Sequence, residues 1–267
     1  DVWFAGILGW GASGIALGTV IAEWTTVLLA GWLVYRTLNE RKLLTEVFWP
    51  KAKIMDLSAL LKTASANLDI MLRTLILVFS FAFFINQSAK FGDTVLAGNH
   101  ILLQLIAFSA FFLDGYAFVV EALVGGAIGA KRSDVFDLAV RRSTVLALIT
   151  AILLASVIVL AGDIAVMLMT DISSVRLAAN QLLPFAALYV LFSFAAFQLD
   201  GIFIGASFAR QMRDAAALSI VVYFIAWWAL SDQHGIQGLW GAMIIYVVAR
   251  AVALLLFYPS LRRSVRG

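Results

Sequence analysis

The stretch FQLDGIFIGASFARQMRD, residues 197–214, places a carboxylate inside an apolar run. Asp200 precedes Arg210, the first positive charge after it, by ten residues, which is about 15 Å of α-helix. An ionisable group at the centre of a bilayer costs at least about 2.5–3.5 kcal/mol, so it should face protein or water rather than lipid. The stretch therefore predicts a membrane helix with an inward-facing carboxylate.

The composition of the whole chain agrees with this prediction. Of the 267 residues, 63% are hydrophobic and only 13% are charged, whereas soluble domains carry about 25% charged residues. We therefore expect an all-α, polytopic integral membrane protein. Cysteine is absent, which excludes disulfide and thiol chemistry. No HExxH, GxSxG or P-loop motif and no nucleic-acid-binding patch is present, so we expect neither an enzyme nor a bound cofactor or metal.

The apolar runs between charged residues predict the membrane spans. A helix needs about 20 apolar residues to cross the hydrocarbon core. Six good spans cover residues 12–35, 57–87, 95–127, 143–167, 178–205 and 236–258. A shorter seventh covers 214–231, and residues 2–9 resemble the tail of an eighth. Because the chain opens with Asp1 directly before this tail, we expect a fragment that starts inside a helix.

Basic residues are concentrated in every second connection, so they gather at one end of the spans. One set of connections carries Arg36, Arg41, Lys42, Lys51, Lys53, Lys131, Arg132, Arg141, Arg142, Arg210, Arg213, Arg262, Arg263 and Arg266. The opposite connections carry only Lys90 and Arg176. The positive-inside rule therefore predicts a cytoplasmic C-terminus. The longest connection, residues 39–56, is basic and predicts a boundary between two lobes.

A short glycine pattern occurs twice. GASGIALGTVIAEW, residues 11–24, and GIQGLWGAMIIYVV, residues 235–248, both begin a span with GxxG after a short preceding span. Small residues let membrane helices approach closely. The matching positions indicate two related halves, as in many transporters.

Polar side chains of the span 57–87 share one helix face. Asp69, Arg73, Ser80 and Gln87 fall within about 80° of arc. Asp69 and Arg73 have the i,i+4 spacing of a helical ion pair. The pair either only permits insertion into the membrane or belongs to a polar stripe that lines a central cavity, with Asp69 as a candidate proton site.

Two other spans carry similar stripes. Gln104, Asp114 and Glu121 share a face of 95–127, and Tyr189, Ser193 and Asp200 share a face of 178–205. Glu121 precedes Lys131 by the same ten residues that separate Asp200 from Arg210, so we expect the two carboxylates at one depth. Carboxylates that share an apolar site can take up and release a proton near neutral pH. This favours a proton-coupled carrier.

Some polar and aromatic residues leave less specific expectations. Glu23 and Arg250 are lone charges in the two repeated spans, and the sequence assigns neither a role. Trp227, Trp228 and Trp240 flank the connection 231–235 and are interpreted as anchors at the membrane interface.

Three segments carry a resemblance to a known family. They are residues 67–105, residues 111–134 (FFLDGYAFVVEALVGGAIGAKRSD) and residues 197–214, with an LDG triplet at 113–115 and again at 199–201. Together they resemble the multidrug and toxic compound extrusion (MATE) family, in the branch named after DNA-damage-inducible protein F. The start of the span 12–35 is similar to the last helix of a MATE half.

The resemblance implies a twelve-helix fold in two six-helix lobes around a central cleft. Residues 1–38 would end the N-terminal lobe, 57–260 would form the C-terminal lobe with helices 7 to 12, and 261–267 would be a cytoplasmic tail. Helices 1 to 4, with an acidic residue of helix 1 that many members use for coupling, would be missing. Asp200 matches an acidic residue of helix 10 in many members. The helix-7 glutamate of many members falls near Arg73, which departs from the sodium-driven pattern.

The expected function is export of drugs or toxic organic compounds by alternating access, coupled to protons or sodium, in a bacterial inner membrane. The proton or sodium gradient takes the place of a cofactor. Protonation of Asp200, with Asp69, Glu121 or Asp114, would drive the cycle. A small cationic or amphipathic substrate would bind along Arg73, Ser80, Gln87, Gln104, Tyr189 and Ser193. The alternatives are a lipid-linked oligosaccharide flippase of the same superfamily and a non-transporting membrane scaffold.

Overall fold

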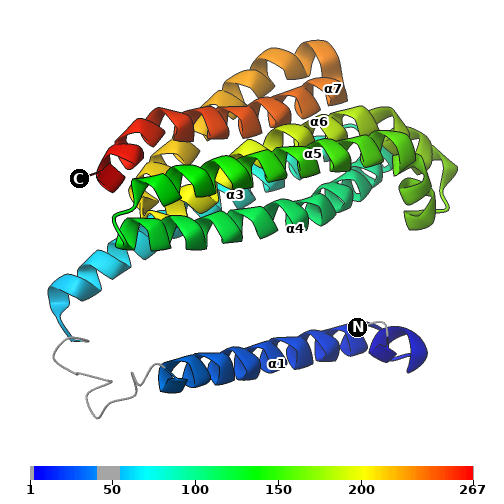
Figure 1. The fold of residues 1–267 in the computed structure, drawn as a ribbon. Coiled ribbons are helices and arrows are strands. Elements are labelled where there is room, and N and C mark those ends of the chain that lie inside the picture. Colours follow the sequence, from blue (N-terminus) through cyan, green and yellow to red (C-terminus); the bar gives the residue numbers. More distant parts are fainter. Residues whose placement is uncertain (1–2, 41–54, 267) are drawn as a thin grey trace. The chain divides into compact units, whose positions relative to one another are not determined.

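The computed structural model describes residues 3–40 and 55–266, and these residues are helical apart from short connections (Figure 1). The chain divides into two compact units, Asp1–Lys62 and Thr63–Gly267, which are described separately. The elements are η1 (Trp3–Ile7), α1 (Gly11–Glu40), α3 (Leu57–Ala89), α4 (Asp93–Gly129), α5 (Ser133–Met169), α6 (Ser173–Gly205) and α7 (Ala209–Arg266). Most of the predicted loop 39–56, with its four basic residues, lies outside the described part.

Six of these helices are long and apolar enough to cross a membrane. Each contains a predicted span, although α5 begins ten residues before its span 143–167, and the predicted spans 214–231 and 236–258 are both parts of α7. The backbone of α7 leaves helical geometry at Gly235, where φ is 53° and ψ is −128°. Only glycine adopts this conformation readily, so Gly235 marks the turn between two membrane crossings. The protein is therefore a multi-pass, all-helical membrane protein.

In the first unit, the short helix η1 folds back onto the start of α1. A Cβ atom on Gly14 would lie 2.7 Å from the backbone of Phe4, so only glycine permits this approach. The Phe4 and Trp10 rings stack with their centroids 5.9 Å apart. Gly11, at the turn, has φ of +52°.

The same turn recurs in α7, where the second predicted GxxG lies. Gly235 matches Gly11 in its positive φ. A Cβ atom on Gly238 would lie 2.2 Å from the Leu230 carbonyl oxygen. Gly14 makes the equivalent close contact with the backbone of Phe4, which also precedes its turn. In both copies the first glycine makes the turn and the second allows two helical segments to pack backbone to backbone. This shared geometry supports the relation between two halves that the sequence pattern indicates.

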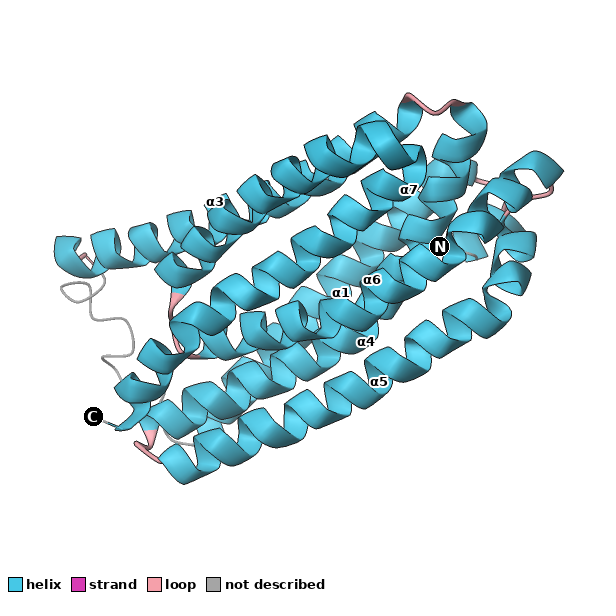
Figure 2. Cartoon of the chain, turned by 90° about the horizontal axis from the view of Figure 1, so that it is seen from above, coloured by secondary structure: helices cyan, strands magenta, loops and turns pink. Residues whose placement is uncertain are grey.

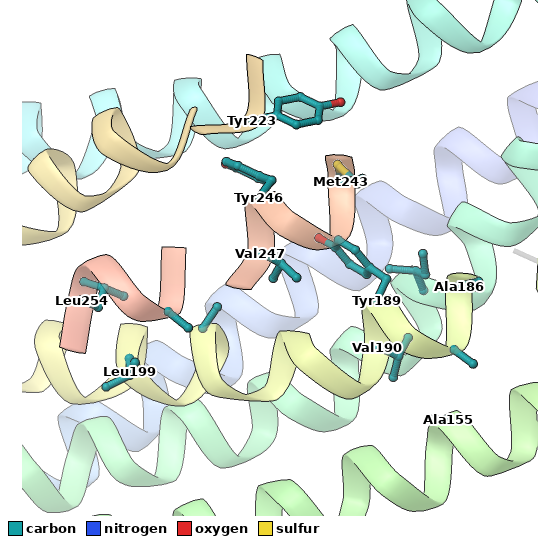
Figure 3. Close-up of a cluster of buried hydrophobic side chains, with 14 of the residues drawn as sticks. Ala155, Ala186, Tyr189, Val190, Leu199, Tyr223, Met243, Tyr246, Val247 and Leu254 are labelled. Carbon is teal, nitrogen blue, oxygen red and sulfur yellow. The ribbon is translucent and has the colours of Figure 1, made fainter. Parts of the chain in front are cut away.

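The second unit is built around α6. This helix packs against α4, α5 and α7, and about half of its residues are buried. Its core with the second half of α7 includes Tyr189, Leu199, Met243 and Tyr246 (Figure 3). Protein packs on another side of this helix as well, where Gln198 donates a 2.5 Å hydrogen bond to the Ser143 hydroxyl of α5.

Two glycines bring α6 into backbone contact with α4. A Cβ atom on Gly201 would lie 2.3 Å from the Ala117 carbonyl oxygen, and one on Gly205 would lie 2.4 Å from the Glu121 carbonyl oxygen. This GxxxG pair is the small-residue spacing that lets membrane helices approach closely. The contact fixes the register of the two helices in the segment that carries Asp200.

A buried polar chain joins α3, α4 and α7. The Trp240 indole N–H donates to Asn99 Oδ1 at 3.0 Å, and Asn99 Nδ2 donates to the Ser88 hydroxyl at 2.9 Å. Trp240 is fully buried against Phe84, with ring centroids 4.9 Å apart. The prediction that Trp240 anchors the membrane interface is therefore wrong, because its ring fills the core and its N–H has an internal partner.

The predicted tail, residues 261–267, begins within the C-terminal end of α7. Residues 261–266 continue the helix, and Leu261 and Val265 are buried. Arg262 also pairs with Asp137 of α5 at 2.7 Å. Side-chain packing and this ion pair explain why the helix extends beyond the apolar run that ends near residue 258.

Candidate functional site

A cavity of about 610 Å³ lies within the second unit. Its wall comes from α3, α4, α6 and α7, all of which are membrane-spanning. The charged and polar lining residues are Arg73, His100, Gln104, Asp114, Glu121, Tyr189, Ser193, Asp200 and Arg250. The cavity therefore combines polar groups of four helices inside a largely apolar frame.

Asp200 is the centre of an ion-pair cluster in this wall. One carboxylate oxygen, Oδ2, accepts hydrogen bonds from Arg73 of α3 and from Arg250 of α7. The side chains of Asp200 and Arg250 are each 8% exposed, and that of Arg73 is 16% exposed. Two guanidinium groups thus share one buried carboxylate, which ties three helices together.

This arrangement corrects two sequence-based predictions. The i,i+4 pair between Asp69 and Arg73 does not form, since each side chain binds a partner on another helix. The groups that bind Asp200 are cations rather than a second carboxylate. Spacing along one helix could not show either result, because the competing partners come from α6 and α7.

Asp69 belongs to a second ion pair, away from the cavity wall. Its Oδ1 accepts a hydrogen bond of 2.6 Å from Arg213 of α7. Arg213 also binds the neighbouring Asp214 at 2.7 Å. Asp69 is buried, and it is absent from the cavity lining. The two ion-pair clusters lie one helical turn apart along α3.

The predicted substrate stripe divides in a similar way. Arg73, Gln104, Tyr189 and Ser193 line the cavity, whereas Ser80 and Gln87 are buried outside it. The Ser80 hydroxyl donates to a backbone carbonyl of its own helix at 2.8 Å. The face of α3 that meets the cavity carries Arg73 and three apolar side chains, Leu77, Phe81 and Ile85.

The two predicted site carboxylates of α4, Asp114 and Glu121, both line the cavity, at different levels. Gly201 packs on Ala117 and Gly205 packs on Glu121, so Asp200 is level with residue 116 of α4. Glu121 then lies five residues, about 7.5 Å, farther along, and Asp114 lies only about 3 Å away along the axis. The predicted common depth of Asp200 and Glu121 is therefore wrong, and Asp114 is the carboxylate nearer in level.

The sequence did not identify two of the lining groups. The sequence assigned Arg250 no role, and His100, on the stripe of Gln104, Asp114 and Glu121, was interpreted as an interfacial residue; both line the cavity. Arg250 is a lone charge in an apolar span, and this was a usable signal because such a charge requires a counter-charge. Tyr189 adds an aromatic wall, with its ring 6.3 Å from that of Phe81.

Comparison with known proteins places this fold and site in a family. Residues 70–229, more than half of the chain, match the family model described as MatE. The chain belongs to the MATE family. The matched range begins just after Asp69 and contains most of the cavity wall, including Arg73, Asp114 and Asp200.

Individual MATE relatives agree with this assignment. The chain is 32% identical over 261 residues to the DNA damage-inducible protein F of Escherichia coli K12, covering 95% of this chain and 54% of the relative. It is 23% identical over 251 residues to Protein DETOXIFICATION 42 of Arabidopsis thaliana, covering 94% of this chain and 47% of the relative. The chain therefore spans about half the length of these MATE proteins.

A solved MATE structure shows the same fold. The Vibrio cholerae MATE transporter VcmN, in a crystal structure of its bent form, superposes with a TM-score of 0.79 at 19% identity. The match covers 99% of this chain and 59% of VcmN. The predicted MATE-like fold is thus confirmed.

Proposed function

We propose that this chain forms the C-terminal lobe and the end of the N-terminal lobe of a proton-coupled antiporter, which exports drugs or other toxic organic compounds by alternating access. The observation that carries the proposal is the buried Asp200 between Arg73 and Arg250, at the wall of a cavity that also holds Asp114 and Glu121. Membership of the MATE family and the 32% identity to the E. coli protein support it.

The geometry supports a physical link between protonation of Asp200 and helix movement in this proposal. A proton on Asp200 would remove the negative charge that holds Arg73 of α3 and Arg250 of α7 against α6. Two buried guanidiniums without a counter-charge are strongly unfavourable. The helices then have to rearrange so that the arginines reach water or other carboxylates. Protonation thereby biases the equilibrium between two conformations of the transporter.

The other cavity groups suit the substrate side of this cycle. Asp114 and Glu121 offer two carboxylates that no guanidinium binds within the described residues, so they can attract a cationic substrate or carry protons. Phe81, Phe118 and Phe197 supply apolar ring surface next to them. An amphipathic organic cation matches this combination of charge and apolar surface.

The working protein requires a second lobe in this proposal. Residues 1–38 would belong to that lobe, 39–56 would connect the lobes, 57–260 would form the C-terminal lobe, and 261–267 would end the chain on the cytoplasmic side. The basic residues at one end of the spans favour this orientation in a bacterial inner membrane. The repeated glycine turn of α1 and α7 supports two related lobes.

The charge of the cavity separates this proposal from its rivals. A flippase for lipid-linked oligosaccharides, which carry phosphate, would favour a predominantly cationic cavity. Here three carboxylates face two guanidiniums in the wall. A scaffold subunit would gain nothing from charged groups around a cavity in the membrane, since each is costly to bury.

The proposal is tested by measuring transport by the full protein that the longest open reading frame containing this chain encodes. Everted membrane vesicles are energised, and the collapse of the proton gradient on addition of an organic cation such as ethidium is followed by a pH-sensitive dye. We expect Asp200→Asn to abolish the exchange, because the switchable charge is lost, and Asp114→Asn to reduce it. Asp163→Asn, an exposed residue of α5, serves as the control.

The protein level of each variant is checked by fluorescence-detected size exclusion, and Asp200→Glu is included because it keeps the charge. Wild-type exchange by a correctly folded Asp200→Asn protein would refute the assignment. Exchange that follows a sodium gradient and ignores the proton gradient would refute proton coupling.

A further inference from the structure

A second concave surface lies at the N-terminal end of α5, outside the cavity. Its volume is about 560 Å³, and its walls are Leu138, Arg141, Arg142, Val145 and Leu146. The spacing of these residues, i, i+3, i+4, i+7 and i+8, places them on one helix face. The four helices that line the cavity do not include α5. This helix runs along an edge of the bundle of residues 63–267, packed on α4 and α6 (Figure 2). The surface therefore faces outward.

The two arginines of this surface carry uncompensated charge. Asp137 is one helical turn before Arg141, but it pairs with Arg262 of α7 at 2.7 Å. Asp134 pairs with an arginine of the preceding connection, also at 2.7 Å. Within residues 3–40 and 55–266, no hydrogen bond or ion pair holds the side chain of Arg141 or Arg142, and both are exposed. The nearby carboxylates are thus engaged elsewhere, and two guanidiniums remain free for a ligand.

The position of the arginines along α5 matches the edge of a bilayer. The apolar run of this helix begins at residue 143, directly after Arg142. On the same face, exposed apolar side chains continue toward the middle of the membrane: Val145, Leu146, Ile149, Ile152 and Leu153. The surface therefore offers charge at the level of lipid headgroups and an apolar strip at the level of acyl chains.

We propose that Arg141 and Arg142 form a binding site for the headgroup phosphate of an anionic phospholipid, with one acyl chain lying along the strip from Val145 to Leu153. Guanidinium groups match the geometry of phosphate oxygens and bind them through paired hydrogen bonds. Basic residues at the membrane surface also attract anionic lipids electrostatically. A zwitterionic lipid brings its own positive charge to the same place, so the site should prefer a lipid with net negative charge.

Lipid binding to the complete purified protein tests this proposal. The protein is delipidated in detergent and titrated with phosphatidylglycerol or with phosphatidylcholine of identical acyl chains, and bound lipids are counted by native mass spectrometry. We expect phosphatidylglycerol to bind more tightly. The variant Arg141→Gln/Arg142→Gln should weaken this binding about 30-fold, because each basic residue near an anionic lipid contributes about fivefold in affinity.

Two further variants isolate the site from general charge. Arg210→Gln/Arg263→Gln removes the same charge from exposed positions of α7 that lie on the same side of the membrane by sequence, and it should leave binding unchanged. Arg141→Lys/Arg142→Lys keeps the charge but loses the planar guanidinium groups with their paired N–H donors. Its affinity for phosphatidylglycerol should therefore fall between those of wild type and the Gln variant. A wild-type Tm for this variant would show that the surface tolerates substitution without loss of folding.

Three outcomes would overturn the proposal. Equal affinity for phosphatidylcholine would show that the headgroup charge is not recognised. Equal loss of binding in the α7 variant would show that only the overall positive charge matters. Displacement of phosphatidylglycerol by inorganic phosphate at equal concentration would show a free-anion site rather than a lipid site.

Discussion

Removing the carboxylate of Asp200 should destabilise the protein far more than loss of one ordinary hydrogen bond. The variant Asp200→Asn leaves Arg73 and Arg250 without their shared counter-charge. Breaking a buried ion pair from one side costs about 3–5 kcal/mol, since the remaining charge stays buried. Both arginines line the cavity, but the Arg73 side chain is 16% exposed and that of Arg250 only 8%, so the larger share of the cost should come from Arg250.

The same reasoning predicts a rescue. In Asp200→Asn/Arg250→Met, the stranded cation is replaced by an apolar side chain of similar length, so at least half of the lost stability should return. Arg73 can then be hydrated from the cavity. The double variant should thus be more stable than the single one, although it carries one more substitution.

Thermal unfolding in detergent, followed by fluorescence-detected size exclusion, measures both effects. For a domain of this size, 1 kcal/mol shifts Tm by about 2–4 °C, so Asp200→Asn should lower Tm by about 6–20 °C. Asp163→Asn is the matched control, because Asp163 is exposed on α5 and bonds only to the next backbone N–H. A Tm for Asp200→Asn equal to that of the control, or no recovery in the double variant, would refute the ion-pair cluster.

Three further substitutions test the packing and the polar contacts, all by the same unfolding assay. Gly201→Ala should destabilise the protein, because its Cβ would lie 2.3 Å from a backbone oxygen of α4. Gly126→Ala, with open space around it, should be neutral or stabilising. Equal effects of the two substitutions would contradict the close contact at Gly201. Asn99→Leu should cost about 1–3 kcal/mol, because the buried Trp240 N–H loses its acceptor, and an unchanged Tm would argue against that bond. Asp69→Asn should lower Tm by less than Asp200→Asn, because Arg213 keeps Asp214 as a second carboxylate partner. The reverse order would show that the Asp69 ion pair contributes more to stability than the Asp200 cluster.

The membrane fold could be predicted from the sequence because one physical rule dominates it. Apolar runs of sufficient length must form helices, and the described helices follow these runs closely. The inward position of Asp200 followed from the cost of exposing a carboxylate to lipid. The glycine turns at Gly11 and Gly235 were visible as a repeated pattern, since glycine has few substitutes where φ is positive.

The partners of the buried charges could not be predicted in the same way. Periodicity placed Asp69 and Arg73 on one face of a single helix. It could not show that Arg213 and Asp200, which lie on other helices, are their actual ion-pair partners. The levels of Asp200 and Glu121 were inferred by counting back from basic residues. The actual register is set by the glycine contacts between α4 and α6, which shift one helix against the other.

The glycine contacts also determine which parts of the cavity wall can change shape. Backbone atoms of α4 and α6 touch at Gly201 and Gly205, so sliding one helix along the other would drive carbonyl oxygens into neighbouring atoms. By contrast, the ion pairs and ring contacts that connect α3 to α6 and α7 are formed by side-chain ends, which can detach and re-form. The α4–α6 part of the cavity wall should therefore be rigid, whereas the position of α3 depends on contacts that a change of side-chain charge can release.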